Sequence, residues 1–456
     1  MIPFVIKPVP CLKGEVSLPG DKSIAHRCVI ISALTPGSTR IENFPLNQDC
    51  LATLNAFRSL GITVTRKDNL KRFSSTVFVS GKGLWGLRRP KKRIFVGDSG
   101  TTLRLILGVL AGQNFTVRLV AGNSLSRRPM LRVTQPLRLM GAKIKAKLKR
   151  QKLKGKKQKV ILEEFPPLTI RGANLNAITY RMTVPSAQVK SALLLSALYI
   201  KGKTKFIETI PTRDHTERIL KLFKAGIKLS KNTIVIAGGR ELVSPKRINI
   251  PGDISSAAFF MVLGATAPKA RILIRDVSLN PSRIGVVSVL KRMGSHIRVK
   301  SYKPSGEKGE PRGDVIVENS RLKGVVVKKE EIPSIIDELP VLMVAACYAE
   351  GWTVFEGINE LRVKETDRIK SMVGNLKKMG ADVRVHRTDT TDKIRIRGVK
   401  RLKGVQVKSF ADHRTAMSMV VAGLFASGET RLDDVSCISK SFPSFLKVLN
   451  NLIVKS

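Results

Sequence analysis

The chain has few cysteines, few aromatic residues and no long apolar run. Its five cysteines are scattered without a Cys-x-x-Cys pair, which excludes a zinc framework of that spacing and a disulfide-stapled secreted domain. No apolar run approaches the ~20 residues that a membrane-spanning helix needs. The segment MIPFVIKPVPC lacks a basic region, and its prolines interrupt any signal-type helix. We therefore expect a reduced, cytoplasmic protein without a membrane partner.

Acidic residues are also scarce. The 82 lysines and arginines outnumber 34 aspartates and glutamates, which gives a net charge of +48. Such an excess favours acidic small molecules, nucleic acid or anionic surfaces as partners. Ten basic residues lie between Lys143 and Lys159, often alternating with other types, which predicts an exposed two-stranded ribbon. No aromatic residue interleaves there for base stacking, so a solvated hairpin is favoured over a nucleic-acid site.

One sequence pattern recurs along the chain: an amphipathic helix, a glycine, and a strand in which apolar and polar residues alternate. It appears as LNAFRSLGITVT, QPLRLMGAKIKA, LKLFKAGIKLS, VLKRMGSHIRVK and LKKMGADVRVH, and a weaker sixth copy, LKVLNNLIV, closes the chain. Each glycine is placed to end its helix in the left-handed conformation; they are Gly61, Gly141, Gly226, Gly294 and Gly380. Six copies predict a duplicated βαβ-type unit and an α/β protein of two domains with three units each.

The seam between the two domains is expected where NIPGDISSAAFF interrupts the chain. Pro251 and Gly252 break the backbone there before a new helix begins. A cleft between two such domains is the default ligand site.

The segment from Ile332 to Arg368 contains the clearest candidates for catalytic residues. Asp337 lies in the apolar run IPSIIDELPVL. Burying a carboxylate there costs free energy unless it is paired with a cation or has a function in catalysis. Further on, in LRVKETDR, Lys364 and Arg368 are one helical turn apart with Glu365 beside them. Two cations, a possible proton donor and a separate base indicate acid/base chemistry on an anionic substrate. A capped helix with surface ion pairs is the alternative.

Two other segments resemble anion sites at the start of a helix. In LPGDKSIAHRCVII, Ser23 and Arg27 share a helix face just after Lys22. In VGDSGTTLRLILGVLAG, Gly100 allows the backbone to approach a ligand closely, although no Walker motif is present. Ordinary helix caps would explain both segments equally well.

Four more segments supply polar and cationic groups. They are SLSRRPM with Arg128, VPSAQVKSALLL with Ser186 and Gln188, FADHRTAM with His413 and Arg414, and SKSFP with Lys440. His413 alone is weak evidence, because a structural histidine is the commoner case.

Together, DKSxxxR, DSGTTxR, SxRP, SAQxKSALL, IDELP, RVKETDR, ADHR and SKSFP resemble the 5-enolpyruvylshikimate-3-phosphate synthase family. The match runs in order over essentially the whole chain. The resemblance implies a two-domain enolpyruvyl transferase fold with three βαβαββ repeats in each domain and the substrate cleft between them. It also implies a discontinuous first domain, 1–20 plus 252–456, because the chain crosses the hinge twice. The second domain would then be 21–251.

The resemblance further implies a reaction and a role for each residue. The family transfers the enolpyruvyl group of phosphoenolpyruvate to the 5-hydroxyl of shikimate 3-phosphate and releases phosphate. Asp337 is expected to accept the hydroxyl proton, and Glu365, helped by Lys22, to protonate C3 of phosphoenolpyruvate. The groups expected to bind shikimate 3-phosphate are Lys22, Ser23, Arg27, Ser186, Ala187, Gln188, Thr212, Asp337 and Lys364. Those expected to bind phosphoenolpyruvate are Lys22, Gly100, Arg128, Gln188, Arg368, Arg414 and Lys440.

Three positions depart from the family pattern. Asp98 stands where many members have asparagine, so it is expected to cap a helix rather than to touch an anion. His215 replaces a tyrosine. Ala187 replaces a second serine, so one hydrogen bond to the phosphate would come from the backbone or be absent.

The resemblance implies neither a metal nor an organic cofactor, and it implies a monomer without a nucleic-acid partner. One alternative is the related transfer of enolpyruvyl to UDP-N-acetylglucosamine, which usually uses a loop cysteine. No cysteine lies between Cys50 and Cys347, which disfavours that activity. The other alternative, a basic nucleic-acid-binding protein, rests on charge alone.

Overall fold

The structure is a computed structural model that describes residues 3–69, 73–153, 159–302, 309–387 and 391–454. The chain divides into two compact units. Unit 1 comprises Met1–Pro19, Pro251–Lys303 and Pro311–Ser456, and unit 2 comprises Gly20–Ile250 and Pro304–Glu310. The domains expected from the sequence, 1–20 plus 252–456 and 21–251, differ from these units by one residue at each seam and by the segment 304–310.

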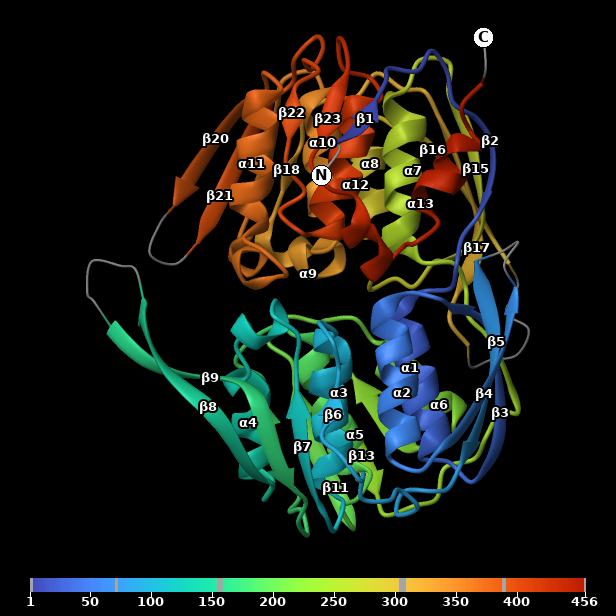
Figure 1. Cartoon of the computed structure of the whole chain (residues 1–456), viewed down its shortest axis with the longest axis vertical. Helices are drawn as coiled ribbons and strands as arrows, with labels where there is room; N and C mark the ends of the chain where they lie inside the picture. The colour runs from blue at the N-terminus through green and yellow to red at the C-terminus, as the bar shows by residue number, and fades with distance from the viewer. Residues whose placement is uncertain (1–2, 70–72, 154–158, 303–308, 388–390, 455–456) are drawn as a thin grey trace. The chain divides into compact units, whose positions relative to one another are not determined.

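Unit 2 contains three four-stranded sheets that follow one pattern (Figure 1). In each sheet the first two strands are parallel, and an antiparallel hairpin completes the sheet. The first sheet has the strand order β14 (Arg247–Asn249), β3 (Gly37–Pro45), β5 (Ser74–Gly81) and β4 (Thr63–Asn69). The second has the order β6 (Ile94–Phe95), β7 (Thr116–Val120), β9 (Lys159–Arg171) and β8 (Lys143–Leu153). The third has the order β10 (Thr179–Arg181), β11 (Gly202–Ile207), β13 (Thr233–Gly238) and β12 (Gly226–Ser230).

Three buried helices form the centre of unit 2: α1 (Lys22–Ala33), α3 (Gly100–Ala111) and α5 (Ala187–Ala197). A helix that is apolar on nearly every side is stable only when it is surrounded by other elements. Three amphipathic helices bury one face each: α2 (Gln48–Ser59), α4 (Leu131–Leu139) and α6 (His215–Leu222). Each buried helix begins at a segment that was predicted to bind anions, so the fold presents three helix N-termini built from those motifs.

Unit 1 repeats the plan with two four-stranded sheets and one smaller sheet (Figure 1). The first sheet has the strand order β2 (Lys13–Ser17), β15 (Arg271–Ser278), β17 (Arg312–Glu318) and β16 (His296–Ser301). The second has the order β18 (Val326–Val327), β19 (Trp352–Glu356), β21 (Asp392–Arg397) and β20 (Asp382–Arg387). The smaller sheet has the order β1 (Phe4–Ile6), β23 (Thr430–Leu432) and β22 (Gln406–Val407). Its buried helices are α7 (Ile254–Thr266), α10 (Leu339–Cys347) and α12 (His413–Gly423). The outer helices are α8 (Gly285–Arg292), α11 (Arg368–Lys378) and the short α9 (Ile332–Ile335) and α13 (Phe445–Asn450).

The sixth repeat is reduced, as its weak sequence signal suggested. Within the described residues, β22, α12 and β23 are followed by α13, and the closing hairpin of the other repeats is missing. β1, from the start of the chain, pairs antiparallel with β23 instead. This pairing places the first residues of the chain in the same unit as the last ones.

Four of the five repeat glycines end their helices as predicted. Gly61, Gly141, Gly294 and Gly380 have φ values of 86°, 108°, 88° and 87°. The prediction for Gly226 is wrong, because α6 ends at Leu222 and Lys224, with φ of 58°, takes the left-handed position. Gly226 instead begins β12, where an added Cβ would lie 2.9 Å from the carbonyl oxygen of Ala237 in β13.

The predicted basic ribbon is confirmed as the antiparallel pair β8–β9. Its register runs from Lys143 opposite Arg171 to Leu153 opposite Lys159. The part of the predicted ribbon at 154–158 lies outside the described residues. None of the helices within the described ranges is long and apolar enough to cross a membrane.

Candidate functional site

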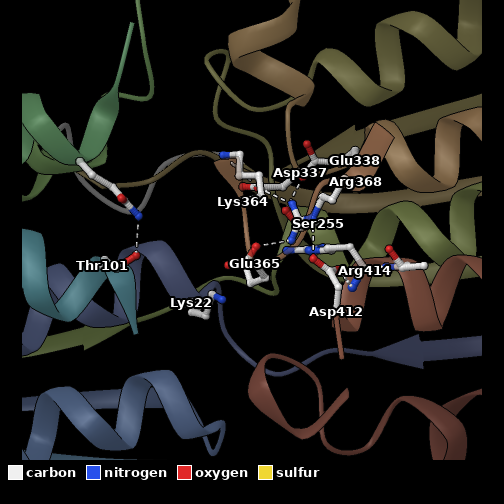
Figure 2. A network of polar contacts seen from close by, with 12 residues as sticks. Lys22, Thr101, Ser255, Asp337, Glu338, Lys364, Glu365, Arg368, Asp412 and Arg414 are labelled. Carbon is white, nitrogen blue, oxygen red and sulfur yellow. Dashed lines mark hydrogen bonds and ion pairs between the residues drawn. The ribbon is translucent and has the colours of Figure 1, made fainter. Parts of the chain in front are cut away.

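In unit 1, Arg368 is the centre of a cluster of acidic side chains (Figure 2). It is the first residue of α11, and its side chain is 1% exposed. Its Nε donates to Asp412 Oδ2 at 2.9 Å, Nη2 to Glu365 Oε2 at 2.7 Å and Nη1 to Asp337 Oδ1 at 3.5 Å. Burial alone would lower the pKa of Arg368, but the three neighbouring carboxylates outweigh burial and raise its pKa above the ordinary value.

Asp412 is fixed by the start of α12. Its Oδ1 accepts the backbone N–H groups of Arg414 and Thr415 at 2.7 and 3.1 Å, and its side chain is fully buried. The two residues before it, Phe410 and Ala411, both have φ of 54°, a conformation that usually costs about 1–3 kcal/mol per non-glycine residue. Lys440 of the 3-10 helix η4 (Ser436–Lys440) donates to Ala411 O at 3.2 Å. Strain is thus concentrated where this loop leads into the site.

Asp337 lies between two cations. Its Oδ1 is 3.8 Å from Nζ of Lys364 and 3.5 Å from Nη1 of Arg368. The Asp337 side chain is 21% exposed, so it is reachable, unlike Asp412. The structure therefore brings together four of the residues predicted from the sequence, namely Asp337, Lys364, Glu365 and Arg368.

Arg414 is a second buried arginine in unit 1, and within the described part of the chain it forms no ion pair with a carboxylate. Its residue is 4% exposed, and its guanidinium carbon lies 5.9 Å from the centre of the Phe259 ring. Nε of Arg414 has no hydrogen-bond partner among the described residues. A buried cation without a carboxylate is costly, so this position favours an anionic ligand.

A third buried arginine fixes the turn that carries Asp337. Arg283 Nη2 donates to Ser255 Oγ at 2.6 Å and lies 3.3 Å from Glu338 Oε1, and Ser255 donates to the same carboxylate. Glu338 precedes α10, Ser255 lies in the first turn of α7, and Arg283 lies just before α8. One buried ion pair thus ties three helix starts next to Asp337.

In unit 2, helix α1 carries the predicted residues Lys22, Ser23 and Arg27. The cap of this helix is Asp21, whose Oδ1 accepts from Ile24 N at 3.0 Å, so Ser23 is not the cap. Lys22 Nζ donates to Asp49 Oδ2 at 2.9 Å, at the start of α2. Arg27 is 3% exposed and donates to Thr216 Oγ1, to Ser191 Oγ and to the backbone oxygen of Ser23, at 2.6, 2.7 and 2.8 Å.

The arginine contacts bear on what Arg27 can bind. Burial lowers its pKa to about 10, although nearby Glu217 and Asp21 favour the charge. A guanidinium has five N–H donors, and three of them are used by these protein contacts. Arg27 is therefore held rigidly and can offer a ligand only part of its hydrogen-bonding edge.

The starts of α3 and α5 meet through Gln188. Its Nε2 donates to Thr101 Oγ1 at 2.9 Å, and its Oε1 accepts from Arg104 Nη1 at 2.7 Å. A Cβ added to Gly100 would lie 2.8 Å from Nη1 of Arg104 and 2.9 Å from Nη1 of Arg128. Gly100 thus leaves space for the ends of two arginine side chains that pack over the first turn of α3.

Ser186, Ala187 and Thr212 surround the start of α5. Ser186 caps this helix and accepts from Val189 N at 3.4 Å, and Ala187 is its first residue. Thr212 is buried and donates its hydroxyl to Glu208 at 2.6 Å. The ammonium group of Lys190 fixes Glu208 and Glu217 at 3.1 and 2.6 Å, so the loop that carries Thr212 rests on a buried ion-pair network.

A buried chain of hydrogen bonds connects the three helices behind this site. His26 Nδ1 contacts Thr53 Oγ1 at 2.6 Å, Thr53 contacts Thr102 Oγ1 at 2.7 Å, and Thr102 contacts Ser99 Oγ at 2.7 Å. Burial, and then the charges of Lys22 and Arg27, hold the pKa of His26 well below its usual value. The chain therefore links α1, α2 and α3 through a neutral imidazole.

Two of the departures from the family pattern have structural explanations. Asp98 does not cap α3, which is capped by Ser99. Asp98 Oδ1 instead accepts from Leu125 N at 3.0 Å, at the start of the 3-10 helix η1 (Leu125–Arg127), which precedes Arg128. His215 is fully buried, and its Nδ1 contacts Glu310 Oε1 at 2.7 Å.

Sequence reasoning missed four site residues: Asp49, Arg104, Ser255 and Asp412. Asp412 and Arg104 belong to motifs that were recognised, ADHR and DSGTTxR, but received no role. An aspartate directly before a buried helix is a capping signal that could have identified Asp412. Asp49 and Ser255 act through partners 27 and 83 residues away, which no local pattern reveals.

Comparisons with known proteins agree over the full length of the chain. The family model of EPSP synthase (3-phosphoshikimate 1-carboxyvinyltransferase) matches residues 6–449. Curated relatives named 3-phosphoshikimate 1-carboxyvinyltransferase include that of Desulforamulus reducens, 43% identical over 99% of this chain and 100% of the relative. The relative of Pelotomaculum thermopropionicum is 45% identical over 97% of both chains.

Solved structures lead to the same family. EPSP synthase from Acinetobacter baumannii has a TM-score of 0.83 at 38% identity, covering 100% of this chain and 99% of that one. The enolpyruvyl transferase NikO from Streptomyces tendae shares the fold, with a TM-score of 0.73 at 18% identity over 99% of this chain and 97% of its own. The predicted enolpyruvyl transferase fold is thereby confirmed, and the chain belongs to the EPSP synthase family.

Proposed function

We propose that the protein transfers the enolpyruvyl group of phosphoenolpyruvate to the 5-hydroxyl of shikimate 3-phosphate and releases phosphate. The names of the full-length relatives support this activity. The observation that carries it at the site is the pairing of two reachable carboxylates, Asp337 and Glu365, with one buried guanidinium, that of Arg368. Such a pair can supply a base and an acid to one anionic substrate.

The proposed reaction begins with addition. The 5-hydroxyl oxygen attacks C2 of phosphoenolpyruvate while Asp337 accepts the hydroxyl proton. Glu365, with Lys22, delivers a proton to C3, which becomes a methyl group. The tetrahedral intermediate then loses one methyl proton to Glu365 and the bond between C2 and the phosphate oxygen breaks. Phosphate leaves with a proton that balances the one Asp337 accepted, so both carboxyl groups return to their starting states. The reaction needs no electron acceptor, because addition followed by elimination leaves the oxidation level of the enolpyruvyl carbons unchanged.

The anionic groups of both substrates match the cations and helix starts. In this proposal Arg368 and Arg414 bind the carboxylate of phosphoenolpyruvate, while Lys22, Gly100, Arg128, Gln188 and Lys440 bind its phosphate. Arg128 packs over the first turn of α3, where free backbone N–H groups favour an anion. Fixed cations of this kind stabilise the leaving phosphate without reorganising during the reaction.

Shikimate 3-phosphate is assigned to groups from both units. Ser23 and Arg27 would bind its carboxylate, and Ser186, Ala187, Gln188 and Thr212 its phosphate, with Lys22, Lys364 and Asp337 nearby. The short hydrogen bond from Thr212 to Glu208 uses the donor of that hydroxyl, so Thr212 reaches the phosphate only if this bond is exchanged. The backbone N–H of Ala187, in the first turn of α5, can replace the hydroxyl of the absent serine.

The test compares two acceptors. Phosphate release from phosphoenolpyruvate is measured with shikimate 3-phosphate and, separately, with UDP-N-acetylglucosamine. We expect rapid release with the first acceptor and none above background with the second. Release only with the sugar nucleotide would assign the protein to the other enolpyruvyl transfer. We also propose a cytoplasmic monomer that does not bind nucleic acid, and light scattering during gel filtration checks the oligomeric state.

A further inference from the structure

The sheet formed by β18, β19, β21 and β20 in unit 1 has one face in the core and one face outside it. Phe355, Val383, Ile394 and Ile396 are buried in the core of this unit. The helices α10 and α11 pack against β21 and β20 respectively, and α11 lies beside these strands in Figure 1. Because side chains alternate along a strand, the residues between the buried ones form the outer face of the sheet.

A hollow of about 440 Å³ opens on this outer face, within the size range of small-molecule sites. It is lined by Val354 of β19, His386 of β20, and Lys393 and Arg395 of β21. Val354 lies opposite Arg395 in the register of the sheet. Lys393 lies opposite His386. Val354 is 9% exposed, so it forms an apolar floor among three basic side chains.

The hollow is open because its two cations on β21 lean away from each other. Lys393 Nζ donates to Glu356 Oε1 at 2.8 Å. The guanidinium carbon of Arg395 lies 4.7 Å from the centre of the Trp352 ring. Trp352 and Glu356 stand two residues before and two residues after Val354, on the same face of β19. The two cationic side chains therefore point to opposite sides of Val354 and leave a gap above it.

The lining has hydrogen-bond donors that the protein itself does not use. The ammonium group of Lys393 has three N–H donors, and Glu356 takes one of them. Among the described residues, no hydrogen bond or ion pair forms with the side chain of Arg395 or of His386. Cations without an acidic partner attract anions. Because all three basic side chains line one hollow, they can act together on a single anion.

We propose that this hollow is a second binding site, and that its ligand is a phosphate monoester with a compact apolar body. The phosphate oxygens accept hydrogen bonds from Lys393, Arg395 and His386. Three donor groups match the three free oxygens and the double charge of a phosphate monoester better than they match a carboxylate. The apolar body covers Val354, which an inorganic ion would leave exposed to water.

This site is separate from the proposed reaction. None of the residues that line the hollow is assigned to either substrate of the enolpyruvyl transfer. Arg368 begins α11, and Asp337 lies just before α10, so both belong to the helices that pack on the inner face of the sheet. Occupancy of the hollow can therefore be measured without turnover.

Trp352 is a local reporter for the test. The chain has two tryptophans, and Trp85→Phe leaves Trp352 as the remaining one. Phenyl phosphate is titrated into this protein, with indole excitation at wavelengths that phenyl phosphate does not absorb. We expect a saturable change in fluorescence, because a ligand bound to Arg395 shifts the guanidinium that lies on the indole ring. Inorganic phosphate, without an apolar body, and benzoate, with a carboxylate, should bind more weakly.

Three variants in the same background test the lining. Lys393→Gln should weaken binding of phenyl phosphate about tenfold, the usual loss of one charge-assisted hydrogen bond. Glu356→Gln should tighten binding, because it releases Lys393 and removes a competing anion. Arg397→Gln is the matched control and should leave the affinity unchanged, since Arg397 is a cation of the same strand and face outside the lining. Methyl NMR signals of Val354 should shift on binding in the parent, which does not depend on any variant folding.

The absence of a saturable change at both Trp352 and the Val354 methyl groups would overturn the proposal. Equal weakening by Lys393→Gln and Arg397→Gln would also overturn it, because the ligand would then respond only to the general charge of the sheet. Inorganic phosphate that binds as tightly as phenyl phosphate would overturn the proposed class of ligand.

Discussion

At the scale of single residues, the site depends on carboxylates held by guanidinium groups. Asp337 keeps partial exposure while Arg368 and Lys364 stabilise its charge. The same two cations offset the negative charge that the ligands bring.

Replacement of Asp337 tests this role. Asp337→Asn should lower turnover by roughly 10²–10⁴-fold, the usual contribution of a positioned general base, with little change in the affinity for shikimate 3-phosphate. Steady-state kinetics and a binding titration measure the two effects. Asp382→Asn removes an exposed carboxylate of the same unit and should leave turnover unchanged. Near-normal turnover of a folded Asp337→Asn protein would remove Asp337 from this role.

At the scale of elements, buried polar contacts tie the helix starts together. In unit 1, Arg283 joins α7, α8 and α10 through Ser255 and Glu338. In unit 2, the chain from His26 to Ser99 joins α1, α2 and α3. Functional groups at a helix start are only as well placed as the start itself, so these contacts are expected to matter for both stability and function.

The buried arginine gives a stability prediction. Arg283→Met leaves the Glu338 carboxylate buried without its cation, which typically costs about 3–5 kcal/mol. Arg298→Met removes the ion pair between the exposed Arg298 side chain and Glu318, a surface pair worth less than about 1 kcal/mol. Urea unfolding of parent and both variants compares the two. Equal losses of unfolding free energy would show that burial of the Arg283 pair is not what matters.

His26 gives a prediction for pH dependence. Because its pKa in the folded protein lies well below 6.5, the unfolded chain binds a proton at His26 that the folded chain does not. Its contribution to stability is therefore fully present above pH 6.5 and is lost as pH falls below that value. Between pH 6.5 and 5.5, the parent should lose about 1 kcal/mol more than His26→Gln. Parallel losses in urea unfolding at both pH values would contradict this assignment.

The sequence predicted the elements well where the signal is local. Helix, glycine and strand recur in a fixed order, and the left-handed conformation was correct at Gly61, Gly141, Gly294 and Gly380. It failed at Gly226 because α6 ends earlier and Lys224 adopts that conformation. The helix start that Asp98 holds, at Leu125, is 27 residues away, so no local pattern identifies it. The motifs located the site residues, but long-range pairs such as Arg368 with Asp412 decide which acids accompany them.

At the scale of the whole molecule, the proposed site draws on both units. Lys22 belongs to unit 2 and Asp337 to unit 1, and both are assigned to shikimate 3-phosphate. A ligand bound by groups of both units restricts how the units can move relative to each other.

Scattering in solution tests this coupling. We predict that shikimate 3-phosphate lacking its 5-hydroxyl, together with phosphoenolpyruvate, lowers the radius of gyration of the parent by drawing the units together. Arg414→Ala should need more phosphoenolpyruvate to reach the same decrease, because a lost charge-assisted hydrogen bond weakens binding by about 1.5–3 kcal/mol. An unchanged scattering profile at saturation would count against ligand-driven closure.

In the proposed reaction, C3 of phosphoenolpyruvate gains a proton at the Glu365 site and then loses one. The measurement that tests it most directly is the mass spectrum of the product formed in D₂O from shikimate 3-phosphate and unlabelled phosphoenolpyruvate. We expect deuterium in the vinyl group, because the methyl group of the intermediate contains one solvent deuterium and elimination removes any of its three hydrogens. A product that contains only the original vinyl hydrogens at full turnover would contradict it.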